Sequence, residues 1–329
     1  MPKSGRKALL ASIASTIADY RRGEIPKPDV DHVGTWIEQF DASVRDGLLV
    51  ELDYVLKKTY FSESDVERFL GSVAGTTKLA SADPCSFWRG ANFLRIQSAG
   101  NSQRDMLAMF EGVLEKRCGL SLVDCGSDDG PYIYLDDAVF SGNKIRNDFL
   151  GWIQKSAPQT AKVHVLVIGL HRGGQWYAGT AIQEGAKAAG RKVDVTWWRS
   201  LEIEDRKRYI ANSDVLRPAS IPNDAEVQAY VQTLKYQPTL RGGNSLGENN
   251  FFSSDGGRHL LEQEFLKTGV HIRSICPYLN RYQRPLGNMV LETLGFGSLL
   301  ITFRNCPNNS PLALWAGDPW YPLFPRKTN

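Results

Sequence analysis

The stretch that decides the fold reads Tyr132-Ile133-Tyr134-Leu135-Asp136-Asp137-Ala138-Val139-Phe140-Ser141-Gly142-Asn143-Lys144-Ile145. An apolar run typical of a buried strand leads into two adjacent acids, and a Ser-Gly pair then precedes a helical pattern. Ligands of open α/β sheets bind at the carboxyl ends of the strands, so this strand delivers two carboxylates to a binding edge. Adjacent strand residues point to opposite faces, which gives Asp136 and Asp137 different surroundings.

The loop behind the acids suits an anion. Ser141 and Gly142 precede a predicted helix, where backbone N–H groups and the helix dipole favour negative charge. The two carboxylates suit the hydroxyl groups of a vicinal diol. Taken together, the stretch predicts a site for a ribose 5-phosphate.

Strand and helix patterns alternate on both sides of this stretch, which predicts a doubly wound parallel sheet of the α/β class. The run at 163–170 is apolar and β-branched, as expected for a strand buried on both faces. The predicted strands are 93–97, 120–125, 132–135, 163–170 and 192–198, and the predicted helices between them are 103–116, 143–155 and 175–189.

The flanking parts are predicted to be a helical N-terminal region (1–82) and a C-terminal hood (201–329) around the α/β core (83–200). A Gly-, Asn- and Ser-rich stretch at 241–257 indicates a mobile loop, and the aromatic C-terminal tail is expected to dock. The predicted helices are 8–22, 35–60 with a division at Gly47, 65–73, 201–212, 224–234 and 260–268, and a strand is predicted at 299–304.

Composition excludes several classes. Among 329 residues, 39 Lys and Arg balance 36 Asp and Glu, which argues against a polycation or an acidic tail, and 42% hydrophobic residues argue against wholesale disorder. The basic start and short apolar run at 3–17 indicate an amphipathic helix rather than a signal peptide, and no stretch suits a membrane span. We expect a cytoplasmic protein with reduced thiols at Cys85, Cys118, Cys125, Cys276 and Cys306, because their number is odd and no CxxC spacing occurs.

The stretch that carries the acids resembles the phosphoribosyl pyrophosphate (PRPP) signature of the type I phosphoribosyltransferases, which is an apolar strand, two acids, three residues, then Thr or Ser and Gly. The resemblance implies that Asp136 and Asp137 hold the ribose hydroxyls. It also implies that Mg²⁺ is the cofactor and is held indirectly, through the ribose. The 5-phosphate cradle would be Phe140, Ser141, Gly142, Asn143 and Lys144.

Other positions follow the same family order over about residues 90–200. The resemblance implies a pyrophosphate loop after the preceding strand, at Gln97, Ser98, Ala99, Gly100, Asn101 and Ser102. It places the base or acceptor side at the end of the following strand, near His171 and Arg172. Two departures stand out: Asn143 and Lys144 replace the usual small residue and Thr, and Phe140 replaces the acid of purine-salvage members. Ordinary purine salvage is therefore disfavoured.

A second resemblance is narrower. Residues 302–312 contain Asn305-Cys306-Pro307-Asn308-Asn309, similar to an Asn-x-Pro-Asn-Asn motif of phosphoribosyltransferase-like effectors in bacterial anti-phage systems such as retrons. That resemblance implies that Asn305, Asn308 and Asn309 form part of a hood on the acceptor side. It also implies a defence role with a retron reverse transcriptase, its nucleic acid or another defence subunit as partner.

Two hypotheses remain open. The first is an enzyme that binds PRPP or a related nucleotide and transfers the ribosyl phosphate with Mg²⁺. The second is a non-catalytic PRPP or nucleotide sensor, or a nucleic-acid or partner-binding module on the same fold. The sequence leaves the acceptor and homo-oligomerisation open.

Overall fold

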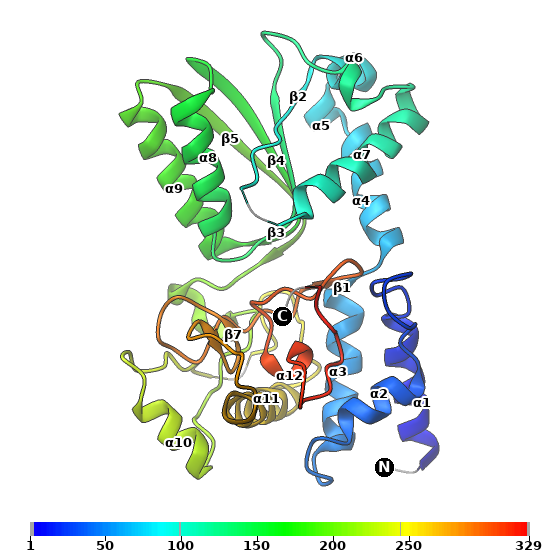
Figure 1. Cartoon of the computed structure of the whole chain (residues 1–329), viewed down its shortest axis with the longest axis vertical. Coiled ribbons are helices and arrows are strands. Elements are labelled where there is room, and N and C mark those ends of the chain that lie inside the picture. Colours follow the sequence, from blue (N-terminus) through cyan, green and yellow to red (C-terminus); the bar gives the residue numbers. More distant parts are fainter. Residues whose placement is uncertain (1–2, 99, 244, 328–329) are drawn as a thin grey trace. The chain divides into compact units, whose positions relative to one another are not determined.

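A computed structural model describes residues 3–98, 100–243 and 245–327 (Figure 1). The chain groups into two compact units. Ser64–Ile203 form one, here called the central unit, and Met1–Glu63 with Glu204–Asn329 form the other, the terminal unit. This grouping differs from the three regions drawn from the sequence, because residues 64–82 belong to the central unit and the two ends of the chain share one unit. The three regions stay a prediction of domain boundaries.

A parallel sheet forms the centre of the central unit. Its strands are β2 (Asn92–Phe93), β3 (Tyr132–Val139), β4 (Thr160–His171) and β5 (Lys192–Ile203), in the order β2-β3-β4-β5. All three pairings are parallel, and Asp136 of β3 lies opposite Val167 of β4. Val163, Val165 and Val167 are fully buried, as the β-branched run predicted. The mixed α/β class with a parallel sheet is confirmed.

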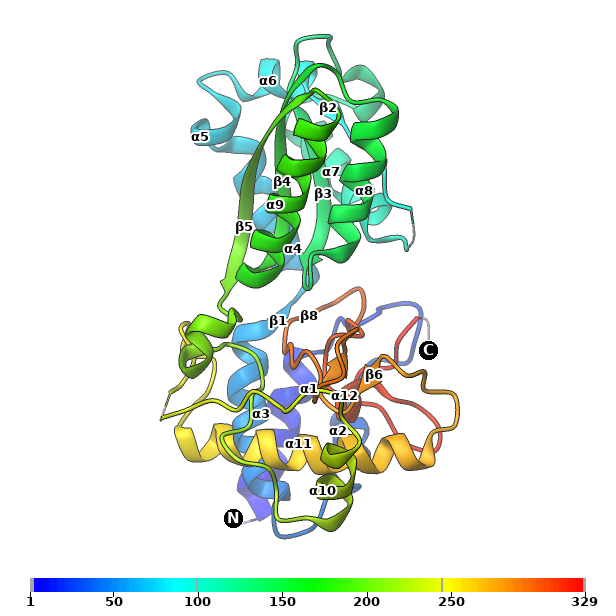
Figure 2. The ribbon, with the colours of Figure 1, turned by 90° about the vertical axis from the view of Figure 1, so that its left-hand side faces the viewer.

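Helices cover the sheet on both sides. α8 (Asn143–Lys155) and α9 (Arg172–Ala188) lie side by side on one face, and α7 (Ser102–Cys118) lies on the other side (Figures 1 and 2). Phe149 of α8 and Ile182 of α9 share one apolar core with the valines of β4. The order of the described strands follows the chain without a reversal, so the doubly wound arrangement stays a prediction.

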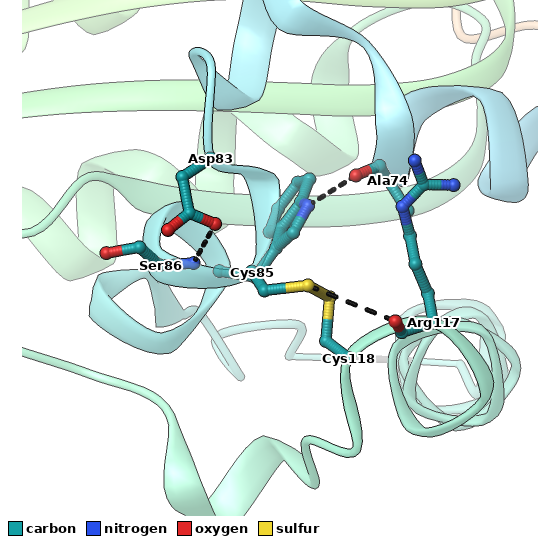
Figure 3. The surroundings of a disulfide bond; sticks show 7 residues. Ala74, Asp83, Cys85, Ser86, Arg117 and Cys118 are labelled. Atoms are coloured by element: carbon teal, nitrogen blue, oxygen red, sulfur yellow. Dashed lines mark hydrogen bonds between the residues drawn. A yellow bond between two sulfur atoms is a disulfide. The ribbon is translucent and has the colours of Figure 1, made fainter.

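Three short helices and a disulfide complete the central unit: α4 (Glu63–Gly75), α5 (Thr77–Ala80) and α6 (Pro84–Gly90). Cys85 in α6 and Cys118 at the end of α7 form a disulfide, with their Cα atoms 5.4 Å apart (Figure 3). The prediction of reduced thiols is therefore wrong for these two residues. They are 33 positions apart in the sequence, and only the packing of α6 beside the end of α7 brings them together. Cys125, Cys276 and Cys306 are free.

Two predicted strands of the central unit differ in the structure. Residues 120–125 hold a 3₁₀ turn, η1 (Leu122–Asp124), because the side chains of Ser121 and Asp124 exchange hydrogen bonds with each other's backbone in a capping box. The strand predicted at 93–97 ends at Phe93. Beyond it, the side-chain carbonyl of Gln103 accepts hydrogen bonds from the backbone N–H groups of Ile96 and Gln97, which diverts the chain from the sheet.

The terminal unit is mainly helical and irregular, and its long helix α11 (Asp255–Ile275) packs against α3 and α10 (Figure 2). Gly47 lies inside α3 and does not divide it. A Cβ at this position would lie 2.5 Å from Leu260 of α11. The remaining elements are α1 (Lys3–Thr16), α2 (Val30–Ile37), α3 (Arg45–Thr59), β1 (Tyr60–Phe61), η2 (Lys207–Asn212), α10 (Ala225–Gln232), β6 (Gln283–Arg284), β7 (Gly287–Asn288), β8 (Ile301–Thr302) and α12 (Leu312–Trp315).

Other predictions for this unit have mixed outcomes. The helix predicted at 201–212 is wrong, because β5 continues to Ile203 and only the short η2 follows. Within the stretch predicted as a mobile loop at 241–257, Phe251 and Phe252 are buried, residue 244 lies outside the described residues, and mobility stays a prediction. The aromatic tail docks as predicted, with Trp315, Trp320 and Phe324 buried. Among the described residues, no helix combines the length and apolar character that crossing a membrane requires.

Candidate functional site

The two predicted acids lie inside β3, near its carboxyl end. Asp136 is buried, with 2% of its surface exposed, and Asp137 is half-buried. Their carboxylates accept hydrogen bonds from the next backbone N–H along the chain, Asp136 Oδ1 from Asp137 N at 2.9 Å and Asp137 Oδ1 from Ala138 N at 2.8 Å. The two neighbours therefore differ in accessibility, as expected for residues on opposite faces of a strand.

The second oxygen of Asp136 faces three donors. Lys144 Nζ lies 3.0 Å from Asp136 Oδ2, the Tyr134 hydroxyl 3.4 Å and Gln97 Nε2 3.5 Å. A buried carboxylate is costly unless it is paired and hydrogen-bonded, and here a cation and several dipoles meet that requirement. With both oxygens engaged, Asp136 is the anchor of the network, and Asp137 is the more accessible of the two acids.

The predicted phosphate cradle connects β3 to α8. Gly142 has φ +80° and is the N-cap residue of α8, a conformation that favours glycine. The first turn of α9 packs tightly against this loop. A Cβ on Gly174 would lie 1.9 Å from the carbonyl oxygen of Phe140, and one on Gly142 would lie 2.3 Å from the carbonyl oxygen of Gly174. The N-termini of α8 and α9 therefore meet at this edge, where both favour an anion.

The predicted pyrophosphate loop lies beside the acids. Gln97 Nε2 donates to Ser102 Oγ at 3.0 Å, and the Gln97 side-chain carbonyl accepts from Gln103 N at 3.2 Å. Lys144 Nζ also donates to Ser102 Oγ, at 2.8 Å, which ties the loop to α8. Gly100 and Asn101 are exposed. Ala99 lies outside the described residues.

Three residues that the sequence reasoning missed support this loop. The Tyr134 hydroxyl donates to Asp148 Oδ2 at 3.0 Å, and Asp148 Oδ1 accepts from both the backbone N–H and the hydroxyl of Ser98, each at 3.1 Å. Gln103 is 3% exposed and holds the backbone of residues 96–97. Burial, together with the charges of Asp136 and Asp148, raises the pKa of Tyr134 far above its usual range. This hydroxyl therefore remains a donor at any working pH.

A signal for two of them was present in the sequence. Asp148 occupies a position on the apolar face of α8 between Ile145 and Trp152, where a charged residue needs a buried partner. Tyr134 precedes Asp136 by two residues and so shares its strand face. Gln103 gives no comparable pattern.

The predicted acceptor-side residues of the central unit are occupied within the protein. His171 is fully buried, and its ring centroid lies 5.1 Å from that of Phe140. Arg172 pairs with Glu202 of β5, with its Nε 2.7 Å from a carboxylate oxygen. Contact of His171 with an acceptor would require this packing to open, so its geometry favours a supporting role behind Phe140.

The asparagines of the Asn-x-Pro-Asn-Asn motif lie in the terminal unit. Asn309 Nδ2 donates to the carbonyl oxygen of Asn288 at 3.1 Å, and the carbonyl oxygen of Asn308 accepts from Asn288 N at 2.7 Å. Asn305 Oδ1 accepts from Lys327 N at 3.3 Å. These bonds hold the turn at 305–311 against β7 and the tail. That these asparagines form part of a hood over the sugar stays a prediction.

Cys306, in the same motif, is buried. Burial raises the pKa of its thiol to about 12 and makes it a poor nucleophile.

The donor set suits phosphates and hydroxyls better than a directly ligated metal. Among residues 3–98, 100–243 and 245–327, no group of three His, Cys, Asp or Glu side chains is placed to hold a metal ion. Both oxygens of Asp136 are already hydrogen-bonded, and a lysine ammonium group balances its charge. Asp136 therefore does not fit as a direct ligand of Mg²⁺, and a Mg²⁺ ion held indirectly, through the ribose, stays a prediction.

The parallel sheet, the acid pair near a strand end and the loops on either side define a phosphoribosyltransferase-like α/β protein. A comparison with family models agrees: the model named PRTase-CE matches residues 33–326. The match covers most of the chain, which therefore belongs to the PRTase-CE family, a phosphoribosyltransferase-like family. No curated protein and no solved structure matches the chain.

Proposed function

We propose that the protein binds PRPP or a closely related ribose phosphate and transfers its ribosyl phosphate group to an acceptor. The observation that carries the proposal is one hydrogen-bonded network, in which Asp136, Lys144 and Ser102 join the acid pair, the start of α8 and the loop at 97–102. PRPP presents a diol, a 5-phosphate and a pyrophosphate, and these three segments offer one matching partner for each.

In this assignment Asp137 accepts hydrogen bonds from the ribose hydroxyls, and Asp136 fixes the geometry behind it. The backbone N–H groups at the start of α8 receive the 5-phosphate, as at other helix N-termini that bind anions. The loop at 97–102 receives the pyrophosphate with its backbone and with the Ser102 hydroxyl. Each role follows the family signature residue by residue.

For the proposed transfer, the protein mainly has to orient the substrate and to stabilise the charge that develops on the leaving pyrophosphate. The bond between C1 of the ribose and the pyrophosphate oxygen breaks, and its electron pair leaves with pyrophosphate. The acceptor then forms the new bond to C1 and releases its proton to solvent. Fixed donors around the leaving group stabilise the charge that develops there. Phe140 stands where purine-salvage members have an acid. No side chain at this position can therefore act as a base, so the acceptor is expected to be nucleophilic without one.

The biological role that we propose is an effector of bacterial anti-phage defence, with a retron reverse transcriptase complex or another defence subunit as partner. Its support is the motif at Asn305, Asn308 and Asn309 in a PRTase-CE chain. Incubation with a purified retron complex would test this role, with co-elution as the expected result.

The central test is calorimetric titration with PRPP and Mg²⁺, followed by a pyrophosphate-release assay with candidate acceptors. We expect wild-type protein to bind and Asp137→Asn to bind at least about tenfold more weakly, since a charged hydrogen bond contributes about 1.5–3 kcal/mol. Asp194→Asn is the matched control, because Asp194 is an exposed acid of β5 in the same sheet.

Each result decides between the hypotheses. Binding with release of pyrophosphate supports the enzyme. Binding without release under any acceptor supports the sensor, which the absence of an acid at Phe140 also favours. Absence of PRPP binding by folded wild-type protein would overturn the proposal.

A further inference from the structure

Lys144 occupies an unusual place in the candidate site. It lies in the first turn of α8, and its ammonium group bridges Asp136 Oδ2 at 3.0 Å and Ser102 Oγ at 2.8 Å. One cation thus contacts both the buried acid of the acid pair and Ser102, which is the last residue of the predicted pyrophosphate loop and the first residue of α7. In the signature of the family, this position usually holds a Thr.

The positive charge of Lys144 balances the buried carboxylate of Asp136. The Asp136 side chain is only 3% exposed, and Lys144 is its cationic partner, with 42% of the lysine side chain exposed. An ammonium group has three N–H donors, and Asp136 and Ser102 engage two of them. The third remains to face a ligand oxygen from the half-open side of the group. Ser102 Oγ accepts from Lys144 and Gln97, so its own proton is left to donate elsewhere.

We infer that Lys144 is a resident cation of the site, which supplies the positive charge between sugar and pyrophosphate and makes PRPP binding independent of Mg²⁺. The inference rests on the proposed function. Its basis is the bond between the Lys144 ammonium group and Asp136 Oδ2, which places a positive charge of the chain itself between the acid pair and the loop at 97–102. Lysine binds phosphate as a point charge, so it needs no fixed coordination geometry to replace the ion.

The test is PRPP titration in EDTA and in Mg²⁺, with wild type, Lys144→Gln and Lys144→Arg. Gln keeps N–H donors but removes the charge, whereas Arg keeps the charge. We expect wild-type affinity to change less than about threefold between EDTA and Mg²⁺. For Lys144→Gln we expect the affinity for PRPP to fall at least about tenfold in EDTA, equal to about 1.4 kcal/mol. We expect Mg²⁺ to restore most of that affinity. Lys144→Arg is expected to retain most of the metal-independent binding.

Recovery by Mg²⁺ separates a resident cation from a purely structural lysine, since a distorted site would not be repaired by a free ion. Lys155→Gln at the exposed end of α8 is the matched control and is expected to behave as wild type. Wild-type binding that requires Mg²⁺ would overturn the inference and leave the proposed function intact. Equal affinity of Lys144→Gln and wild type in EDTA would also overturn it. Absence of PRPP binding by wild type in both buffers would instead overturn the proposed function.

Discussion

Two groups of charged side chains, one in each unit, differ in their access to solvent. In the terminal unit, Glu262 pairs with Arg258 at 2.8 Å and with Arg241 at 3.0 Å, and the side chains of all three are at most 1% exposed. In the central unit, the Asp136 side chain is also buried, at 3% exposed, but its partner Lys144 is 42% exposed. The first group is closed to solvent, whereas the second has one cation that a ligand can reach.

The closed group connects parts of the terminal unit that are distant in sequence. Glu262 also accepts from Arg217 N at 3.0 Å, and Arg258 donates to the carbonyl oxygens of Ser245 and Val215, each at 3.1 Å. Burial raises the pKa of the Glu262 carboxyl even though two guanidinium groups lower it. A buried ion network of this kind adds little net stability, but removing one member leaves an uncompensated charge. The closed group therefore has a structural role, and the open group is the one to which we assign the proposed binding role.

The largest effect is expected from Glu262→Gln. Loss of this carboxylate leaves Arg241 and Arg258 buried without their shared partner, and we expect the free energy of unfolding to fall by about 3–5 kcal/mol. Urea unfolding followed by circular dichroism measures this change in the free energy of unfolding. Arg68→Gln is the control, because it breaks an exposed pair with Asp65 and is expected to cost less than about 1 kcal/mol. Similar values for the two variants would contradict the structural role.

The second-largest effect concerns the disulfide. The central unit has this covalent cross-link, whereas the terminal unit has the buried ion pairs. Reduction of Cys85–Cys118, whose residues are 33 positions apart, frees the unfolded chain and is expected to cost about 2–4 kcal/mol. Thermal unfolding with and without dithiothreitol measures the loss. The double variant Cys85→Ser, Cys118→Ser should unfold like the reduced wild type and should not respond to dithiothreitol. A response of that variant would show that the reductant acts elsewhere.

A smaller effect is expected from Tyr134→Phe, which probes the support of the open group. The hydroxyl bridges Asp148 and Asp136, so its removal leaves buried carboxylate oxygens with fewer donors and is expected to cost about 1–3 kcal/mol. PRPP affinity should fall as well, because Asp148 also holds Ser98. Tyr132→Phe is the matched control on the same strand, since the Tyr132 hydroxyl makes no hydrogen bond with any of the residues that the structure describes. Equal stability of the two variants would contradict the bridging role.

Much of the fold and of the candidate site in the central unit could be predicted from local sequence patterns. The helix at 143–155 matches α8 to the residue, and the β-branched run at 163–170 lies within β4. The acid pair and the Ser141–Gly142 loop lie at the edge where the strand ends, because a strand that leads into a helix start has few other arrangements. Local signals suffice where chain neighbours are also the interacting partners.

The remainder depended on partners that are distant in sequence. The strand predicted at 93–97 failed because the Gln103 side chain replaces a strand partner, and no pattern in the apolar run indicates that. The Cys85–Cys118 bond depends on how α6 meets α7. Lys144 was assigned to phosphate from its place in the signature, but its bond to the buried Asp136 appears only when α8 is placed against β3.

The smallest effect is a dependence of the central unit's stability on pH, through His164. Trp198 Nε1 donates to His164 Nδ1 at 3.1 Å in the central unit, so this nitrogen must be unprotonated. Burial, and then the charge of Lys162, lower the pKa of His164 below 6.5. Its folded form therefore binds the proton less well than its unfolded form. Stability is complete above pH 6.5 and is lost as the pH falls through the lowered value.

Urea unfolding of wild type and His164→Gln at pH 7.5 and 5.5 isolates the histidine. We expect wild type to lose about 1 kcal/mol more than the variant over this interval, the value of one net hydrogen bond. Equal losses would show that His164 carries its proton at no cost and that acid acts on the central unit through other groups.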